Sequence, residues 1–144
     1  MDKPRLDKKM DSGKPSTKDR GDAAEDLALA HLQGHGLRLV QRNFRTPGRG
    51  GGEIDLIMRE PDGTLVFVEV RRRRGLSHGG AAASIDGAKR GRIVLAARHF
   101  LLRLGHTPPC RFDVVLVQGD GEANAHHALP RLDWMRAAFD TDGH

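Results

Sequence analysis

Two acidic residues, Asp55 and Glu69, stand in apolar segments where a charge is unfavourable. Asp55 interrupts the run Ile54–Ile57, and Glu69 falls within Phe67–Arg71. A carboxylate in such surroundings needs a hydrogen bond or a cation to compensate its lost hydration. We expect the two segments to pair as antiparallel strands, which can set Asp55 beside Glu69. Because two carboxylates that close repel each other, the pattern favours a divalent cation between them.

A metal site of this composition predicts phosphodiester chemistry. Carboxylate oxygens, a backbone carbonyl and water are ligands suited to Mg²⁺ or Mn²⁺ rather than to zinc. Such an ion can lower the pKa of a bound water and neutralise phosphate charge. A structural alternative stays open, in which Asp55 or Glu69 forms an ion pair with Arg71 or a neighbouring arginine. Glu69 and Arg71 are two residues apart on a strand and therefore share a face.

Basic residues concentrate in residues 71–103. The 144-residue chain carries 24 Lys plus Arg and 19 Asp plus Glu, and residues 71–103 alone hold nine basic groups and one acidic group. Clustered cations are typical of a protein that binds a nucleic-acid backbone, although a solvated helix face is an equal alternative. With five Phe, one Trp and no Tyr, the chain lacks a base-stacking platform. This favours duplex or branched DNA over single strands.

The positions of these residues depend on a predicted α/β fold. Apolar periodicity predicts a helix from Asp22, its N-cap, and a long helix over 84–104. Between and after them, the patterns predict strands at 37–44, 53–59, 64–71 and 111–117. Residues 125–129 are expected to form a short strand, and Pro130 to open a last helix carrying Leu132, Met135 and Phe139. The order is α-β-β-β-α-β with a short C-terminal strand and helix, a mixed sheet flanked by helices.

The composition predicts one domain with a charged N-terminal extension. Residues 1–18 mix both charges with Gly, Ser and Pro, which indicates a disordered tail, and residues 19–144 form the domain. No run approaches the ~18 apolar residues of a membrane helix. The N-terminus lacks the features of a signal peptide, so we expect a cytoplasmic protein. Cys110 is the single cysteine, which excludes an internal disulfide.

Four motifs in order, at residues 52–57, 67–73, 79–84 and 111–115, resemble those of the YraN-like family of uncharacterised bacterial proteins. That family is similar to the PD-(D/E)XK nucleases related to Holliday junction resolvases. The resemblance implies a restriction-endonuclease-like core with Asp55, Glu69 and Arg71 as catalytic residues. It also implies that Asp55, Glu69, the Val70 carbonyl and Glu25 hold the metal. For Glu25, a role at the first turn of its helix is an equal alternative.

Position 71 departs from the nuclease motif, which has Lys where this chain has Arg71. A lysine can shift its pKa and help activate water, whereas a guanidinium stays protonated and cannot act as a base. Arg71 can still grip a phosphate through two hydrogen bonds. Lys89, early in the long helix, could reach into the site if that helix starts beside the acidic end of the sheet.

Three functions therefore remain open. The first is a metal-dependent endonuclease or endonuclease-like hydrolase that acts on DNA, including junction DNA, and uses Mg²⁺ or Mn²⁺. The second is a non-catalytic nucleic-acid-binding module on the same fold, and the third is an adaptor that binds an acidic protein. Analogy with junction resolvases suggests a homodimer. The expected DNA contacts are Arg71, Arg72, Arg73, Arg74, Ser84, Lys89 and Arg92. Asp113 is expected to be a structural acid bonded to an arginine or the backbone.

Overall fold

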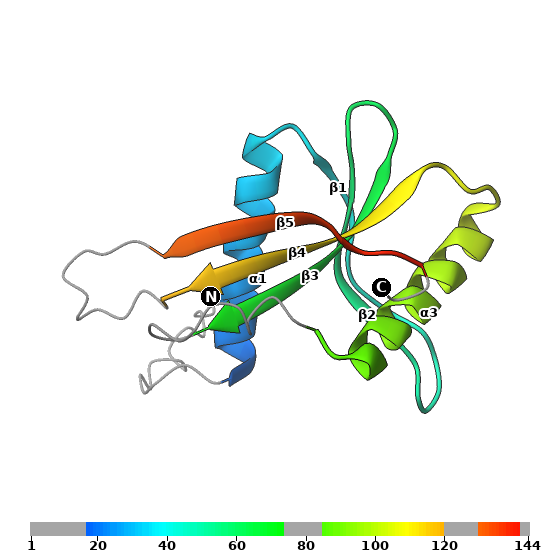
Figure 1. The fold of residues 1–144 in the computed structure, drawn as a ribbon, viewed down its shortest axis with the longest axis horizontal. Helices are drawn as coiled ribbons and strands as arrows, with labels where there is room; N and C mark the ends of the chain where they lie inside the picture. The colour runs from blue at the N-terminus through cyan, green and yellow to red at the C-terminus, as the bar shows by residue number, and fades with distance from the viewer. Residues whose placement is uncertain (1–16, 74–84, 120–129, 142–144) are drawn as a thin grey trace, which may run out of the picture.

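A computed structural model describes residues 17–73, 85–119 and 130–141, which form one five-stranded sheet and two helices (Figure 1). The strand order is β1-β2-β3-β4-β5, and only β3 and β4 are parallel. The helix α3 makes the crossover that a parallel pair requires. The elements are α1 (Thr17–Gly34), β1 (Arg38–Arg45), β2 (Glu53–Arg59), β3 (Leu65–Arg73), α3 (Gly87–Leu104), β4 (Cys110–Gln118) and β5 (Arg131–Phe139).

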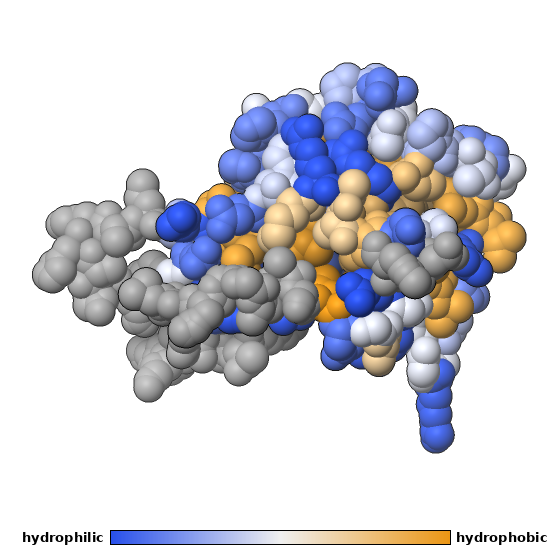
Figure 2. Space-filling model, in the orientation of Figure 1, coloured by the Kyte–Doolittle hydropathy of each residue, from blue (hydrophilic) through white to orange (hydrophobic). Residues whose placement is uncertain are grey.

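The two faces of the sheet carry separate apolar cores, one under each helix. Leu65 and Phe67 of β3 pack with α3, whereas Val66 and Val68 pack with α1. This alternation follows from the two-residue period of a strand and puts Glu69 on the face of Leu65 and Phe67. Figure 2 shows hydrophobic surface along α3, where Leu102 is 78% exposed.

The predicted order of the first six elements is confirmed, but both helices begin elsewhere. α1 starts at Thr17, so Asp22 lies within the helix and is not its N-cap. α3 is capped by Asp86, whose Oδ1 accepts a hydrogen bond from the Lys89 backbone N–H at 2.8 Å. Ser84 is therefore not the N-cap, and its own position lies outside the described residues. A carboxylate cap satisfies an otherwise unpaired N–H at the helix start and favours the positive end of the helix dipole.

The predicted C-terminal helix is wrong, because Arg131–Phe139 is the strand β5. It pairs antiparallel with β4 from Gln118↔Arg131 to Phe112↔Phe139, and an irregularity falls near Ala137, whose φ is 49°. Leu132 packs on the α1 face, whereas Met135 and Phe139 pack on the α3 face. Their helical spacing thus comes from apolar residues on both faces of one strand. The strand expected at residues 125–129 lies outside the described part of the chain.

Neither described helix combines the length and apolar character needed to cross a lipid bilayer.

Candidate active site

Asp55 lies where β2 separates from β3. The two strands pair from Arg59↔Leu65 to Leu56↔Val68, and the pairing stops there, while β2 stays paired with β1 as far as Glu53. The Val70 N–H, which would continue the ladder, donates instead to Asp55 Oδ2 at 2.8 Å. The Asp55 side chain therefore replaces a backbone acceptor at the fork between the strands.

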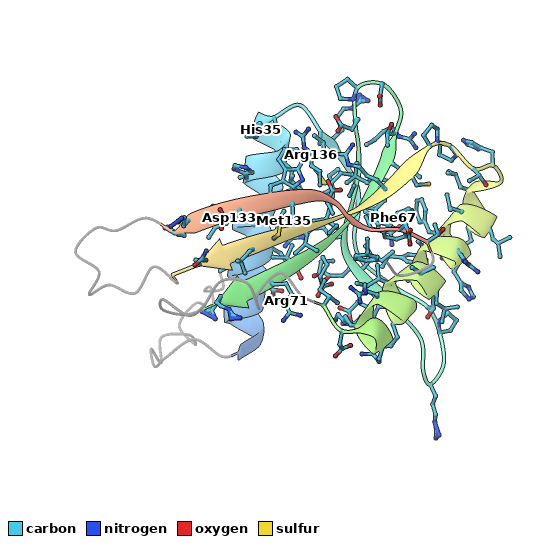
Figure 3. All side chains as sticks on the ribbon, in the orientation of Figure 1. His35, Phe67, Arg71, Asp133, Met135 and Arg136 are labelled. Atoms are coloured by element: carbon cyan, nitrogen blue, oxygen red, sulfur yellow. The ribbon has the colours of Figure 1, made fainter. Side chains whose placement is uncertain are left out.

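Glu69 reaches this fork from β3 on the face that α3 covers. It is 6% exposed, and its Oε2 lies 3.5 Å from Lys89 Nζ in the first turn of α3. Arg71 is the next residue on that face, and its charge lowers the pKa of Glu69. Figure 3 shows Arg71 on β3, between α1 and α3 in this view. The structure thus brings Asp55, Glu69, Arg71 and Lys89 together.

Burial raises the affinity of both carboxyl groups for a proton, and Glu69 raises that of Asp55 further. Burial raises the pKa of Asp55 to about 7, and the charge of Glu69 and a hydrogen bond shared with it act in the same direction. Burial also raises the pKa of Glu69, although Lys89, the bond to Asp55 and Arg71 oppose the rise. A buried acid pair with these properties retains a proton near neutral pH unless a cation displaces it.

The Val70 carbonyl faces the same fork. The N–H and C=O of one strand residue point to the same side of the strand, and the Val70 N–H points at Asp55. Two carboxylates and one carbonyl therefore surround the opening, and all three supply oxygen.

Glu25 lies close to the pair but is held by other residues. It is 9% exposed on α1, and its Oε1 accepts hydrogen bonds from Arg42 at 3.3 Å and Asn43 at 3.4 Å. Its pKa is raised mainly by burial and then by the charge of Asp55, so the two acids are near enough to interact electrostatically. In the described part of the chain, no three Asp, Glu, His or Cys side chains are grouped to hold one ion. Glu25 therefore does not complete a three-residue cluster in this conformation.

Comparison with known proteins places the chain in a family. The model described as "Uncharacterised protein family UPF0102" matches residues 24–117. The chain belongs to this family. A UPF0102 protein of Polaromonas sp. (strain JS666 / ATCC BAA-500) is 62% identical over 128 residues, covering 89% of this chain and 85% of that protein. One of Acidovorax sp. (strain JS42) is 58% identical over 137 residues, covering 94% and 96%. The recognition of a YraN-like protein is confirmed.

The UPF0102 match spans every residue of the acid site, from Glu25 to Lys89, and ends before β5. The other predicted DNA contacts that the structure describes, Arg72, Arg73 and Arg92, differ in exposure. Arg72 and Arg73 are partly exposed at the end of β3, and Arg92 is exposed on α3. Arg74 and Ser84 fall outside the described residues.

Asp113 is a structural acid, as its sequence context indicated. It is fully buried, and Arg111 Nε donates to Oδ1 at 3.0 Å, Trp134 Nε1 to Oδ2 at 2.9 Å and the Ala137 N–H to Oδ1 at 2.9 Å. These bonds fasten the irregular part of β5 to β4, and none of them involves a residue of the acid site.

Arg42 and Asn43 were not anticipated from the sequence. Both hold Glu25 across the space between β1 and α1, and Arg42 also pairs with Asp26 at 2.9 Å. Asn43 has a φ of 51°, in the left-handed region that Asn tolerates better than most residues. An Asn inside a predicted strand is the one local signal of this irregularity, because the contact itself depends on the tertiary fold.

Proposed function

We propose that this protein is a metal-dependent endonuclease-like hydrolase that cleaves DNA phosphodiesters at Asp55 and Glu69. The observation that carries the proposal is the buried pair of carboxyl groups at the fork between β2 and β3, with the pKa of Asp55 raised to about 7. A purely structural Asp would be stabilised in its charged form by its partners, as a single hydrogen-bonded carboxylate is. Strongly perturbed acids that share a site are typical of functional residues.

The donors present fit Mg²⁺ or Mn²⁺. Asp55, Glu69 and the Val70 carbonyl offer oxygen atoms only, and a cation that keeps several waters needs few protein ligands. Such an ion, when bound, would lower the pKa of a water and neutralise charge on the phosphate. The carboxylates of Asp55 and Glu69 would lose their shared proton as they bind it. Glu69 is buried and Asp55 is partly buried, so the pair is sheltered on the protein side and open to an ion at the fork.

Lys89 supports catalysis despite Arg71 at the motif position. Its ammonium lies 3.5 Å from Glu69 Oε2 and is 34% exposed, so it can contact both the acid pair and an incoming phosphate. An amine can orient a water and donate to a developing charge. Arg71 keeps a planar guanidinium suited to binding a phosphate on either side of the cleaved bond.

A second candidate is a non-catalytic DNA-binding module, and Arg71 is the observation that favours it. In this alternative, Lys89 neutralises Glu69 as a structural ion pair. The arginines at the end of β3 then bind DNA phosphates, and the protein does not cleave the DNA.

Calorimetry with Mn²⁺ tests the metal site. The wild-type protein should bind Mn²⁺, and Asp55→Asn should weaken binding at least about tenfold. Asp62→Asn is the matched control, because Asp62 lies in the exposed turn after β2 and accepts a bond from the Thr64 N–H. Equal Mn²⁺ heats for the wild type and Asp55→Asn would refute the hydrolase proposal.

Binding and cleavage of duplex and four-way-junction DNA separate the remaining functions. Cleavage with Mg²⁺ or Mn²⁺ that is lost in Asp55→Asn supports hydrolysis. Steeply salt-dependent binding without cleavage supports the binding module. A complete lack of DNA affinity at low salt contradicts both and favours an adaptor for an acidic protein.

A further inference from the structure

The loop between β1 and β2, residues 46–52, is closed tightly at its base. The Thr46 N–H donates to the Gly52 carbonyl at 3.0 Å, and the Gly52 N–H donates to Thr46 Oγ1 at 2.7 Å. A Cβ at Gly51 would lie 2.5 Å from Thr46 Oγ1, so only glycine fits beside these two hydrogen bonds. Thr46 is 8% exposed, which shelters both bonds from water. The two ends of the loop, Thr46 and Gly52, are therefore held together where the loop leaves the sheet, and we call this closed base the neck.

The neck is packed against α3 at the end of the molecule that carries the acid pair. A Cβ at Gly52 would lie 1.9 Å from the Arg92 carbonyl oxygen, so the two backbones are in direct contact. Arg92 comes about one helical turn after Lys89, which pairs with Glu69. Asp55 follows Gly52 by three residues along β2. The loop and the acid pair are thus held in one spatial relationship.

The tip of the loop presents one cation between residues without side chains. Residues 47–50 are exposed, and Arg49 is flanked by Gly48 and Gly50, whose φ values are 91° and 69°. No atom lies within 4 Å of a Cβ built on either glycine. No described residue forms an ion pair or hydrogen bond with Arg49. Figure 1 shows the loop projecting beyond the sheet beside α3, and Figure 2 shows a hydrophilic projection in the same place.

We infer that this loop inserts Arg49 into the minor groove of duplex DNA. A minor groove about 6 Å wide is too narrow for a helix but can receive an arginine side chain from the tip of a loop. Two flanking glycines leave the backbone thin enough to approach the groove floor. A narrow A-tract groove has a strong negative potential that attracts a guanidinium. This inference rests on the proposed DNA partner but not on hydrolysis.

The contact between Arg49 and the minor groove would also fix the position of the acid pair along the duplex. A cation in the minor groove lies between the two phosphate backbones. Because the neck fixes the loop relative to α3 and β2, Arg49 would set which backbone phosphate comes to the fork. The contact would therefore bias both affinity and cleavage position towards A·T-rich, narrow-grooved sequence.

Anisotropy titrations of the full chain with two labelled duplexes of equal length test this inference. One duplex carries a central A-tract and the other a G·C-rich centre. The wild type should prefer the A-tract, and Arg49→Ala should lose the preference and weaken A-tract binding at least about fivefold. The control is Arg38→Ala, which removes the same charge from an exposed residue at the opposite end of β1 and should leave the preference intact.

The outcomes distinguish this inference from the proposed function. Equal affinities of Arg49→Ala and Arg38→Ala for the A-tract duplex would overturn the Arg49 contact while leaving DNA binding in place. A wild type with no preference between the duplexes would overturn it as well. A wild type that binds neither duplex would refute the DNA partner and with it this inference. Saturation of the minor groove by a groove-binding drug should remove the advantage of the wild type over Arg49→Ala.

Discussion

The Lys89 ammonium on α3 lies 3.5 Å from the Glu69 carboxylate on β3. This ion pair brings a lysine to the acid site from the crossover helix, although β3 carries Arg71 at the position where the nuclease motif has lysine. The Asp86 cap starts α3 beside the fork and thereby sets the position of Lys89 in its first turn. The site therefore contains a lysine, Lys89, although the motif position on the strand is Arg71.

Lys89→Gln should lower DNA cleavage by at least about 100-fold, the range expected when a proton-handling group is removed. Mn²⁺ binding at pH 8 should persist, because Lys89 is not a metal ligand and its loss removes a repulsive charge. Cleavage rates and Mn²⁺ calorimetry on the same preparation measure both effects.

Arg98→Gln is the control for Lys89→Gln, since Arg98 is exposed on the same helix and the charge change is equal. Equal cleavage by both variants would show that Lys89 contributes only its charge to the surface.

Asp55→Asn should stabilise the metal-free protein at high pH. The raised pKa, about 7 against an ordinary 3.8, means that the folded state binds a proton more tightly than the unfolded chain. This contribution to stability is complete below the ordinary pKa and is lost as the pH rises through about 7. One pKa unit corresponds to about 1.4 kcal/mol, so we expect the variant to gain at least about 1 kcal/mol at pH 8.

Urea unfolding with EDTA at pH 5 and pH 8 measures this gain. The Asn carbonyl can still accept the Val70 N–H, so the variant removes the charge without removing the bond. If the difference in unfolding free energy between the wild type and Asp55→Asn were the same at pH 5 and pH 8, the raised pKa of Asp55 would be contradicted.

Local patterns predicted the parts of the fold that depend on neighbouring residues. The alternation in β3 placed Glu69 and Arg71 on one face because a strand repeats every two residues. The hairpin placed Asp55 near Glu69 because the Pro61–Gly63 turn sets the register. The position of Asp55 at an open fork could not be predicted, because it depends on where β2 and β3 stop pairing.

Two features of the structure were not predicted from the sequence, because both depend on contacts between distant segments. The bonds from Glu25 to Arg42 and Asn43 join residues 17 and 18 positions apart, and no periodicity encodes them. β5 was predicted as a helix because Leu132 packs on one face of the sheet and Met135 and Phe139 on the other, and this spacing resembles a helical stripe. The buried Asp113 holds the irregular part of β5 in place through Arg111, Trp134 and the Ala137 N–H.

Asp113→Ala should destabilise the fold by at least about 1–3 kcal/mol, the cost of leaving a buried polar group unpaired. Arg111 loses one partner but keeps its ion pair with Glu60 at 2.7 Å. Two further donors, Trp134 Nε1 and the Ala137 N–H, would also lose their acceptor. Trp134 is the single tryptophan, so its fluorescence reports unfolding and the local change together. Asp62→Ala, in an exposed turn, should change stability by less than about 1 kcal/mol.

The folded fraction of Asp113→Ala should still bind Mn²⁺ with unchanged affinity, since the partners of Asp113 are Arg111, Trp134 and the Ala137 N–H and not residues of the acid site. Weakened Mn²⁺ binding by the folded protein would assign Asp113 to the metal site instead.

Gly52→Ala should disturb the acid site through α3. Its added Cβ would lie 1.9 Å from the Arg92 carbonyl oxygen and 3.1 Å from Ala96 Cβ, so helix and strand must move apart. Overpacking of this kind destabilises by about 1–3 kcal/mol. The displacement should also pull Lys89 from Glu69 and lower cleavage.

Gly63→Ala is the control, because Gly63 has open space but a φ of 97°. It should cost about 1–2 kcal/mol of strain without affecting cleavage. Urea unfolding and cleavage assays on both variants separate the two effects, and a Gly52→Ala protein that cleaves like Gly63→Ala would show that α3 does not position Lys89.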